Sequence, residues 1–380
     1  MDIPIVVAAY NRTAPLGRLL RSLAKAHYDS AVKLIVCIDG DGSSDVLKVA
    51  EHFDWVHGEK EIIVQKENIG LKQHILFCGD LSSQYDGVIV LEDDLYVSPW
   101  FYSFAQSTAQ YYSESSGISG IALYSPHFNE NARLPFYPLD DGHDVYFMQI
   151  ACSWGQVWLK RQWEGFRLWY GENECVELNN DESLPWEIRQ WPESSWKKYF
   201  IMYMLEKDKY FVYPRASFTT NFGDMGTHHH GTSLYQVPLK YNDNGNRFVS
   251  LDESLIKYDV FFEIIPESLY RMSPNLPSDR FIVDLYGIKE AHCFTEEFVI
   301  TSKVCKEYII SYGRHLLPVE YNVIDAIPGC DLFWTTPDKI CKIKKDDFRK
   351  FIYERCATIE EQKYYYPLTD FHYFKKHIGG

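Results

Sequence analysis

The sequence predicts an α/β fold, in which a mixed sheet is flanked by helices and followed by a smaller β-rich C-terminal appendage. Short apolar, β-branched runs such as 88–91 alternate with amphipathic helical segments, which is typical of a doubly wound sheet. Several of these runs end in acidic residues, at the strand ends where such sheets bind ligands. After about residue 240, short alternating segments with proline and glycine replace this pattern. We therefore expect two domains, 1–240 and 241–380.

The first domain can be divided into strand–helix units in chain order. An apolar strand is expected at 3–9, and leucines at helical spacing from Leu16 to Leu23 place a helix after it. The alternation then repeats, which implies helices on both faces of the sheet. Further strands are expected in this domain at 33–39, 61–65, 87–91, 117–124, 145–151 and 213–217, and in the appendage at 258–265, 280–287, 298–302 and 307–312.

Composition excludes several classes of protein. The net charge of −15 argues against nucleic-acid binding. No apolar run approaches the ~20 residues of a membrane span. The first residues lack a basic segment, so no signal peptide is expected, and nine scattered cysteines without metal-ligand spacing fit reduced thiols. We expect a cytoplasmic protein, and nothing in the sequence indicates an oligomeric state.

The most informative stretch is 87–97, in which an apolar run ends in Glu92, Asp93 and Asp94. These acids would lie at the carboxyl end of a buried strand, where open α/β sheets bind ligands. Three adjacent carboxylates repel one another unless a cation or ligand hydroxyls neutralise them. A divalent metal that binds a phosphorylated substrate is one interpretation, and a solvated acidic turn is the other.

The order of the motifs resembles that of a known family. Four segments are similar, in the same order, to the nucleotide-sugar-binding half of GT-A-fold glycosyltransferases: the Asn11-Arg12 loop, the strand end at Asp39, the segment Asn68-Ile69-Gly70-Leu71 and the segment Glu92-Asp93-Asp94-Leu95. Within that fold the chain resembles N-acetylglucosaminyltransferase I and its bacterial relatives, and the likeness continues through Ser153-Trp154-Gly155 and 220–226. It covers residues 1 to about 240 and implies a GT-A, Rossmann-like sheet.

The resemblance implies a metal-dependent, inverting glycosyltransferase that uses a nucleotide diphosphate sugar, with a UDP-sugar favoured and Mn²⁺ or Mg²⁺ as cofactor. Asp94 would bind the metal, and Glu92 and Asp93 would bind ribose and sugar hydroxyls. The remaining nucleotide-sugar residues would be Arg12 at the nucleotide or its phosphates, Asp39 at the base, Lys72, and Trp154 with Gly155 at the donor sugar. The structural alternatives are that Asp39 caps the next helix, that Arg12 pairs with a surface acid and that Trp154 lies in the core.

An inverting transferase also needs a carboxylate that deprotonates the acceptor hydroxyl. In the resembled enzymes this base lies just after a Trp-Pro segment. Here the segment Trp191-Pro192-Glu193 is followed by Lys197 and Lys198, where those enzymes carry acids. Glu193 is the first candidate for the base, and an acid near a helix N-terminus is the competing explanation for it. Asp181 is the second candidate and Asp144 the third.

Three further segments bear on the site. The aromatic and acidic interval 163–200 predicts an acceptor-sugar site. The glycine-rich segment 223–231 would be a lid over bound nucleotide, with His228 and His230 as metal or phosphate ligands, and a His-rich surface loop is the alternative. Lysines at 339–350 favour a solvated helix face, with peripheral contact to anionic membrane lipid as the alternative.

These features predict transfer of a sugar to a saccharide or lipid-linked acceptor in surface polysaccharide synthesis. Two alternatives stay open on the same kind of sheet. A sugar nucleotidyltransferase is disfavoured because no glycine- and arginine-rich activation loop follows the first strand. A non-catalytic carbohydrate-binding or scaffold protein is favoured by the lysines after Trp196.

Overall fold

The computed structural model describes residues 1–42, 44–224 and 235–342, which divide into two compact units. Unit 1 comprises Met1–His127 and Tyr137–Asp279, and unit 2 comprises Phe128–Phe136 with the described residues from Arg280 onward. The sequence placed the domain boundary near residue 240, whereas unit 1 continues to Asp279. It does so because a short strand, β13 (Lys257–Tyr258), joins the edge of its large sheet.

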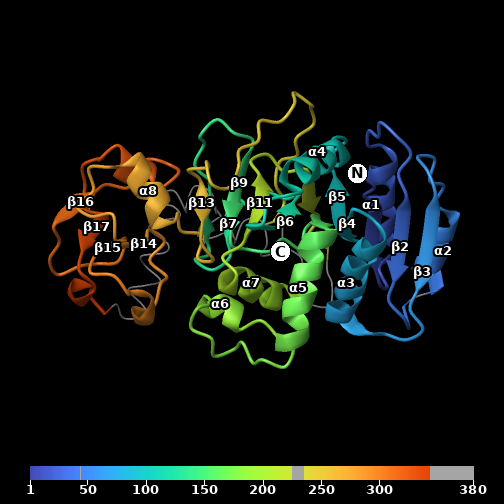
Figure 1. Cartoon of the computed structure of the whole chain (residues 1–380), viewed down its shortest axis with the longest axis horizontal. Helices are drawn as coiled ribbons and strands as arrows, with labels where there is room; N and C mark the ends of the chain where they lie inside the picture. The colour runs from blue at the N-terminus through green and yellow to red at the C-terminus, as the bar shows by residue number, and fades with distance from the viewer. Residues whose placement is uncertain (43, 225–234, 343–380) are drawn as a thin grey trace, which may run out of the picture. The chain divides into compact units, whose positions relative to one another are not determined.

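Unit 1 is built on a nine-stranded sheet (Figure 1). Besides β13, its strands are β1 (Ile5–Ala9), β2 (Leu34–Ile38), β3 (Lys60–Val64), β4 (Gly87–Glu92), β6 (Ile118–Ala122), β9 (Val145–Met148), β10 (Gln156–Leu159) and β11 (Tyr210–Pro214). Their order across the sheet is β13-β9-β11-β6-β10-β4-β1-β2-β3. A separate antiparallel ribbon joins β5 (Leu95–Val97) to β12 (Thr219–Asn221).

The sheet is mixed, as predicted. Strands β1, β2, β3, β4, β6 and β11 run in one direction, and β9, β10 and β13 run in the other. Every residue of β1 and β2 is buried, because helices cover both faces of the central strands. The strand expected at 213–217 lies at 210–214 instead, and Pro214, which has no N–H to extend the ladder, is its last residue.

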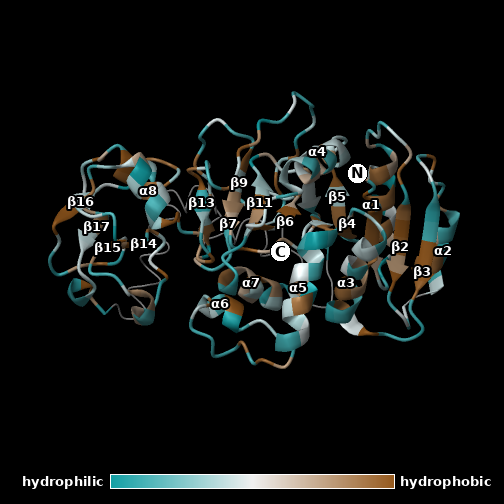
Figure 2. Cartoon of the chain, viewed as in Figure 1, coloured by the Kyte–Doolittle hydropathy of each residue, from teal (hydrophilic) through white to brown (hydrophobic). Residues whose placement is uncertain are grey.

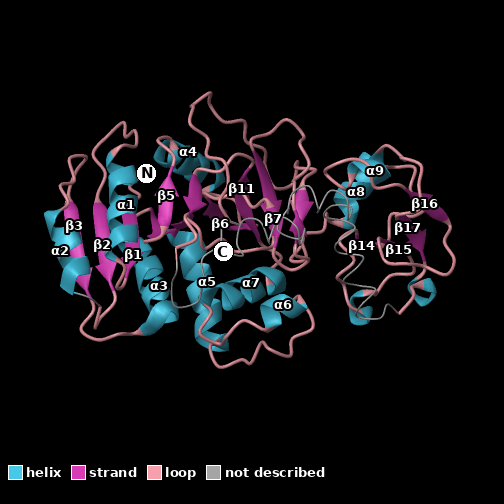
Figure 3. Ribbon diagram, turned by 180° about the vertical axis from the view of Figure 1, so that it is seen from behind, coloured by secondary structure: helices cyan, strands magenta, loops and turns pink. Residues whose placement is uncertain are grey.

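Helices pack on both faces of this sheet. The core on one face is formed with α1 (Thr13–Ala24), α2 (Ser44–His52) and α4 (Phe101–Tyr112). On the other face α7 (Trp196–Glu206) contacts α3 (Gly70–Asp80) and α5 (Lys160–Asn173), and Figure 3 shows these three helices together. Figure 2 shows hydrophobic strands between amphipathic helices. The α1 leucines from Leu16 to Leu23 are fully buried, as their helical spacing predicts.

The aromatic interval 163–200 contributes mainly to the core. Trp163, Trp169 and Trp196 are buried, and the ring centroids of Trp158 and Trp163 lie 4.3 Å apart. The expectation that this interval as a whole lines an acceptor site is therefore wrong for these three tryptophans. Their large apolar surface is better accommodated between α5, α7 and the sheet. Trp186, in the short helix α6 (Trp186–Arg189), is exposed.

Unit 2 contains the β-rich part predicted for the C-terminal region. Its sheet has the order β14-β15-β17-β16, formed by β14 (Ile282–Asp284), β15 (Val299–Thr301), β16 (Ile310–Tyr312) and β17 (Leu332–Thr335). Trp334 is its central buried side chain, with the Phe281 ring 4.8 Å away. A two-stranded ribbon pairs β7 (Phe128–Asn129) with β8 (Leu134–Pro135). The remaining described helices are α8 (Pro266–Met272) in unit 1 and α9 (Tyr321–Ile324) in unit 2. The described 3₁₀ turns are Leu81–Gln84, Ala291–Cys293 and Pro337–Lys339.

Within the described ranges, none of the helices has the length and apolar character needed to cross a membrane. The described cysteines are free thiols, and Cys37, Cys78 and Cys152 are buried.

Candidate functional site

Three parallel strands bring the predicted residues to one edge of the sheet. β1 leads into Arg12, β2 leads into Asp39, and β4 leads into the acidic triplet formed by Glu92, Asp93 and Asp94. β1 lies between β2 and β4 and pairs with both in parallel. The carboxyl ends of all three strands therefore lie side by side, at the edge where open α/β sheets bind ligands.

Arg12 joins two members of the acidic triplet. Its guanidinium donates one hydrogen bond to Asp93 and a second, at 3.3 Å, to Oδ2 of Asp94. The Asp93 side chain is only 6% exposed, so this segment is not a solvated turn. A partly buried arginine shared by two carboxylates fixes their orientation at the end of β4.

One oxygen of Asp94 has unused bonding capacity. Its Oδ1 atom is buried and has no hydrogen-bond partner among the described residues. An unpartnered buried carboxylate oxygen fits a cation ligand, because leaving it bare is costly. The described residues include no group of three or more His, Cys, Asp or Glu that could hold a metal. Mg²⁺ is commonly bound by one or two carboxylates together with water and substrate phosphates, so Asp94 could be a metal ligand without such a group.

Burial and mutual repulsion perturb the acidic triplet. Burial, followed by repulsion from Asp94 and Asp93, raises the pKa of Glu92 to about 8, and Arg12 and Lys197 oppose this rise. Burial also raises the pKa of Asp93 to about 6, although its contact with Arg12 lowers it. Without a ligand, Glu92 is thus mostly protonated at neutral pH. Carboxyl groups perturbed in this way are common at functional sites.

Asp39 is buried to the same extent as Asp93 and makes backbone contacts. Its carboxylate accepts hydrogen bonds from the N–H groups of Gly40 and Ile69, both at 2.9 Å, and from Gly70 at 3.1 Å. It thereby caps the start of α3 and not that of α2, the next helix along the chain. Its contact with the nucleotide base stays a prediction.

Trp154 and Gly155 reach the same edge from β10, which lies beside β4 on the side away from β1. The partly buried Trp154 ring lies 4.8 Å from the Tyr124 ring. Gly155 has a φ of +95°, and a Cβ there would lie 2.9 Å from Cγ2 of Thr219. Glycine therefore allows the chain to turn closely against its neighbours.

Lys72 and Glu193 lie together. The Lys72 ammonium donates to the backbone carbonyl of Glu193 at 3.0 Å. The Glu193 carboxylate accepts a hydrogen bond from Tyr199 at 2.8 Å and one at 3.4 Å from the fully buried Lys198. Glu193 precedes α7 and contacts its first turn, so the competing explanation of an acid near a helix N-terminus agrees with its position.

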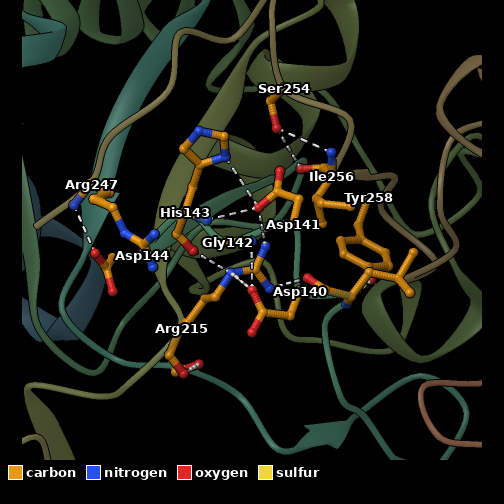
Figure 4. A network of polar contacts seen from close by, with 12 residues as sticks. Asp140, Asp141, Gly142, His143, Asp144, Arg215, Arg247, Ser254, Ile256 and Tyr258 are labelled. Atoms are coloured by element: carbon orange, nitrogen blue, oxygen red, sulfur yellow. Dashed lines mark hydrogen bonds and ion pairs between the residues drawn. The ribbon is translucent and has the colours of Figure 1, made fainter. Parts of the chain in front are cut away.

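The other two candidates for the base have local partners. Asp181 accepts hydrogen bonds from the backbone and hydroxyl of Ser183, in an exposed turn. Asp144 accepts from the backbone N–H of Arg247 at 2.7 Å, within the polar network of Figure 4. Both contacts are of the kind that stabilises a turn or a chain crossing.

The network in Figure 4 is centred on Arg215, which follows β11 at the same sheet edge. Its guanidinium donates to the carbonyls of Leu139 and His143 and, at 2.9 Å, to the carboxylate of Asp141. Asp140 lies 3.6 Å away. We call these residues the Arg215 cluster. It fastens the loop before β9 to the end of β11.

Sequence reasoning missed a second arginine near the acidic triplet. Arg18 on α1 pairs with Asp224, and its guanidinium lies 3.8 Å from the ring centroid of Phe222. Asp224 in turn contributes to the raised pKa of Asp93. The only sequence signal for Arg18 was that it lies on the helix that follows Arg12. His228 and His230, which the sequence places in a lid, lie outside the described residues.

Comparisons with known proteins agree with the motifs. No protein-family model matches the chain. An alpha-1,3-mannosyl-glycoprotein 2-beta-N-acetylglucosaminyltransferase of Arabidopsis thaliana is 22% identical over 263 residues. The chain is similar to N-acetylglucosaminyltransferase I. The predicted resemblance is thus confirmed, and the match spans 63% of this chain and about half, 51%, of that relative.

Solved structures with partial likeness include two ligand complexes. Staphylococcus aureus TarS 1-349 in complex with UDP-GlcNAc has a TM-score of 0.39 at 11% identity, over 60% of each chain. The mannosyltransferase PcManGT from Pyrobaculum calidifontis, in complex with GDP-Man and Mn²⁺, has a TM-score of 0.33 at 9% identity, over 44% of this chain and 46% of that one.

Proposed function

We propose that the chain is a glycosyltransferase that moves a sugar from a nucleotide diphosphate donor, with a UDP-sugar favoured, to a saccharide or lipid-linked acceptor in surface polysaccharide synthesis. The observation that carries this proposal is the acidic triplet at the end of β4, held by Arg12, with Oδ1 of Asp94 unpartnered among the described residues. The sequence similarity to an N-acetylglucosaminyltransferase supports the same chemistry.

Asp94 is the residue that would hold Mn²⁺ or Mg²⁺. When bound, a divalent cation supplies charge stabilisation for the departing diphosphate. Arg12 keeps Asp94 in place, because its guanidinium binds Oδ2 and leaves Oδ1 for the cation. Arg12 also donates a hydrogen bond to Asp93, so that both carboxylates have fixed positions before the donor binds.

The other two acids would bind hydroxyl groups of the donor. Asp93, the more readily ionised of the two, can accept hydrogen bonds from ribose or sugar hydroxyls. Glu92, whose pKa is raised to about 8 in the metal-free protein, is the less readily ionised of the two, and a cation at the neighbouring Asp94 would oppose this rise. The two carboxyl groups would together orient a polyhydroxylated ligand.

For an inverting reaction, Glu193 is the proposed base. Its side chain is 42% exposed, so an acceptor hydroxyl can reach it, and Tyr199 fixes one of its oxygens. Asp181 and Asp144 are the second and third choices, since their carboxylates make turn contacts with Ser183 and Arg247.

Calorimetry with UDP, with and without Mn²⁺, tests the donor site. We expect UDP to bind at least about 10-fold more tightly with Mn²⁺, and Asp94→Ala to abolish this gain. Asp141→Ala in the Arg215 cluster is the matched control and should keep both affinities. Absence of UDP binding in both conditions, or an unchanged Mn²⁺ effect in Asp94→Ala, would refute the assignment.

A non-catalytic carbohydrate-binding protein is the second candidate. It is favoured by the Lys198 and Tyr199 contacts, which engage both oxygens of Glu193. Release of UDP from a panel of UDP-sugars with saccharide acceptors separates the two. Turnover that falls at least about 100-fold in Glu193→Gln supports the enzyme and its base. Binding of UDP-sugars without any turnover supports the second candidate.

A further inference from the structure

An exposed aromatic pair lies next to the acidic triplet. Tyr96 belongs to β5, and Phe222 directly follows β12. Their ring centroids are 5.9 Å apart, and the rings are tilted by 40°. Phe222 is 40% exposed and Tyr96 is half-buried. Exposed apolar surface that adjoins a candidate ligand site is a feature of binding surfaces.

The strand register places this pair on the same face of the ribbon as Asp94. Tyr96 pairs with Thr220, and the N–H of Phe222 donates to the carbonyl of Asp94 at 3.2 Å. Side chains alternate between the two faces of a strand, so Asp94, Tyr96 and Phe222 share one face. The opposite face is buried and is formed by Leu95, Val97, Thr219 and Asn221. The aromatic pair therefore adjoins the proposed metal ligand.

Neighbouring segments hold the pair in place. Gln236 donates to the carbonyl of Phe222 at 3.0 Å, and the N–H of Val237 donates to the hydroxyl of Thr220 at 3.0 Å. The guanidinium of Arg18 lies 3.8 Å from the centroid of the Phe222 ring. Rings that are ordered before binding lose little conformational entropy when a ligand packs on them.

This surface suits the ring of a neutral saccharide. Aromatic faces pack against the C–H groups of a sugar ring, and Tyr96 adds a phenolic hydroxyl for hydrogen bonding. The neighbouring acidic triplet would repel an anionic ligand. Two rings also offer too little apolar area to bind a long hydrocarbon chain, since affinity for such a chain grows with the area buried.

The position of the pair indicates the acceptor and not the donor. The residues expected at the nucleotide and donor sugar follow β1 and β2 or precede β10, and these strands belong to the large sheet. The ribbon of β5 and β12 is separate from that sheet and begins beside Asp94. Transfer needs the acceptor hydroxyl next to the sugar–phosphate bond, and the diphosphate is expected at Asp94. A ligand on the ribbon therefore lies where an acceptor is needed.

We propose that Tyr96 and Phe222 form a subsite for a neutral saccharide acceptor. This rests on the glycosyltransferase function proposed above and adds the class of acceptor. One sugar ring of the acceptor would pack on the aromatic pair while its reacting hydroxyl meets the donor beside Asp94. Recognition through sugar rings does not require a lipid on the acceptor.

Saturation-transfer NMR with four neutral disaccharides tests this proposal in the presence of UDP and Mn²⁺. The probes are maltose, cellobiose, lactose and mannobiose, because contact with C–H faces tolerates differences in linkage and configuration. We expect at least one probe to receive saturation at its ring C–H protons. Tyr96→Thr and Phe222→Thr should each weaken its binding at least about 5-fold, since each removes an aromatic face and keeps a residue that suits a strand.

A similar aromatic pair in unit 2 provides the matched control. The Tyr308 ring is 48% exposed and forms a tilted pair with Phe333, with the centroids 5.1 Å apart. Tyr308→Thr should therefore leave disaccharide binding unchanged. Calorimetry with UDP and Mn²⁺ on each variant reports the donor site separately.

The possible failures are distinguishable. If UDP binds and no disaccharide receives saturation, the acceptor subsite is overturned and the donor-site proposal stands. Binding that survives in both Tyr96→Thr and Phe222→Thr, or that is lost equally in Tyr308→Thr, has the same meaning. A loss of UDP affinity in Tyr96→Thr as large as its loss of disaccharide affinity would assign the pair to the donor and overturn the proposal.

A different result separates the two functions. If the wild-type protein binds the disaccharides and does not bind UDP, the nucleotide-sugar function fails and the acceptor role fails with it. Because the wild-type result alone decides whether a disaccharide binds, a variant that does not fold leaves that part of the test intact.

Discussion

Two arginine-centred clusters lie at the same edge of the large sheet, and only one has the properties of a ligand site. Arg12 binds two carboxylates, and Arg215 binds one carboxylate and two backbone carbonyls. Both are partly or largely buried. The Arg12 cluster, formed by Arg12 and the acidic triplet, differs in two ways. Oδ1 of Asp94 has no partner among the described residues, and the pKa values of Glu92 and Asp93 are raised. Unused bonding capacity, and not charge density alone, therefore distinguishes the two clusters.

The Arg215 cluster uses its hydrogen bonds to hold the chain together. Arg215 is only 15% exposed, and the loop carbonyls of Leu139 and His143 take two of its donors. Asp141 is further bonded by the backbone N–H of His143 at 3.1 Å. These contacts connect residues about 70 positions apart in the chain, which is a structural role. The two clusters should therefore respond in opposite ways to the same substitution.

The largest expected effect comes from replacing each arginine by methionine. Arg215→Met should lower the free energy of unfolding by about 3 kcal/mol, because it removes the charge-assisted hydrogen bond of a largely buried carboxylate and the guanidinium donors of two carbonyls. Its affinity for UDP with Mn²⁺ should stay within about 2-fold of wild type. Arg12→Met should lower that affinity at least about 10-fold with a smaller loss of stability, because Asp93 can take up a proton. Denaturant unfolding and calorimetry measure the two quantities.

The test compares the losses of UDP affinity and of stability between Arg215→Met and Arg12→Met. A loss of UDP affinity in Arg215→Met that equals the loss in Arg12→Met would place both clusters in one site. A stability loss in Arg12→Met as large as that in Arg215→Met would make the Arg12 cluster structural.

Gly155 tests how closely the donor edge is packed. Gly155→Ala should destabilise the protein by about 2 kcal/mol, because its backbone has a φ of +95° and a Cβ would lie 2.9 Å from Thr219 and 3.2 Å from Leu91. Gly171→Ala is the control, since that glycine lies in α5 with no atom near its Cβ position. This control should gain up to about 1 kcal/mol from helix propensity. Equal melting temperatures for the two variants would show that the turn at Gly155 is not constrained.

The sequence predicted which residues meet at the sheet edge where each follows a strand, and it did not predict contacts between distant segments. The acidic triplet, Arg12 and Asp39 each follow a recognisable strand, so their meeting at one edge follows from parallel pairing. The Arg18–Asp224 pair joins residues 206 positions apart, and no local pattern indicates it. The same holds for Lys197, whose ammonium lies 5.5 Å from the ring centroid of Trp154 and 5.0 Å from that of Trp191.

Burial was the second quantity that the sequence did not reveal. Trp163 and Trp196 are as aromatic as Trp186, yet the first two are buried and the third is exposed. The difference depends on which helix face meets the sheet. Acidic residues lie near all three tryptophans in the sequence, so the sequence pattern did not separate the buried ones from the exposed one. Likewise β13 lies beyond the predicted boundary at 240 and belongs to the large sheet through its pairing with β9. A strand of two residues is too short to be recognised from the sequence pattern.

An effect is also expected on the pH dependence of stability in the metal-free protein. The pKa of Glu92 in the folded state, about 8, lies above its unfolded value, so the folded state binds more protons between pH 5 and 8. Stability should therefore fall as pH rises through this window, by about 2 to 3 kcal/mol between pH 5.5 and 7.5. Glu92→Gln should remove most of this slope, and Glu114→Gln, at a side chain that is 91% exposed, should leave it unchanged. Denaturant unfolding at three pH values measures this dependence. An identical slope of stability against pH in Glu92→Gln would contradict the raised pKa of Glu92.

The smallest effect is expected at Arg18, whose replacement should affect both stability and UDP binding slightly. Its pair with Asp224 is partly exposed, so Arg18→Met should cost less than about 1 kcal/mol of stability. The variant should nevertheless weaken UDP binding about 3-fold, because Asp224 is left near Asp93 without its counter-charge and repels the diphosphate. Arg161→Met, which breaks an exposed pair with Glu114, is the control and should change neither quantity. If Arg18→Met binds UDP as tightly as wild type, the Arg18–Asp224 pair belongs with the Arg215 cluster as a structural contact. If it weakens binding in the predicted range, the donor site extends from the acidic triplet to the segment after β12.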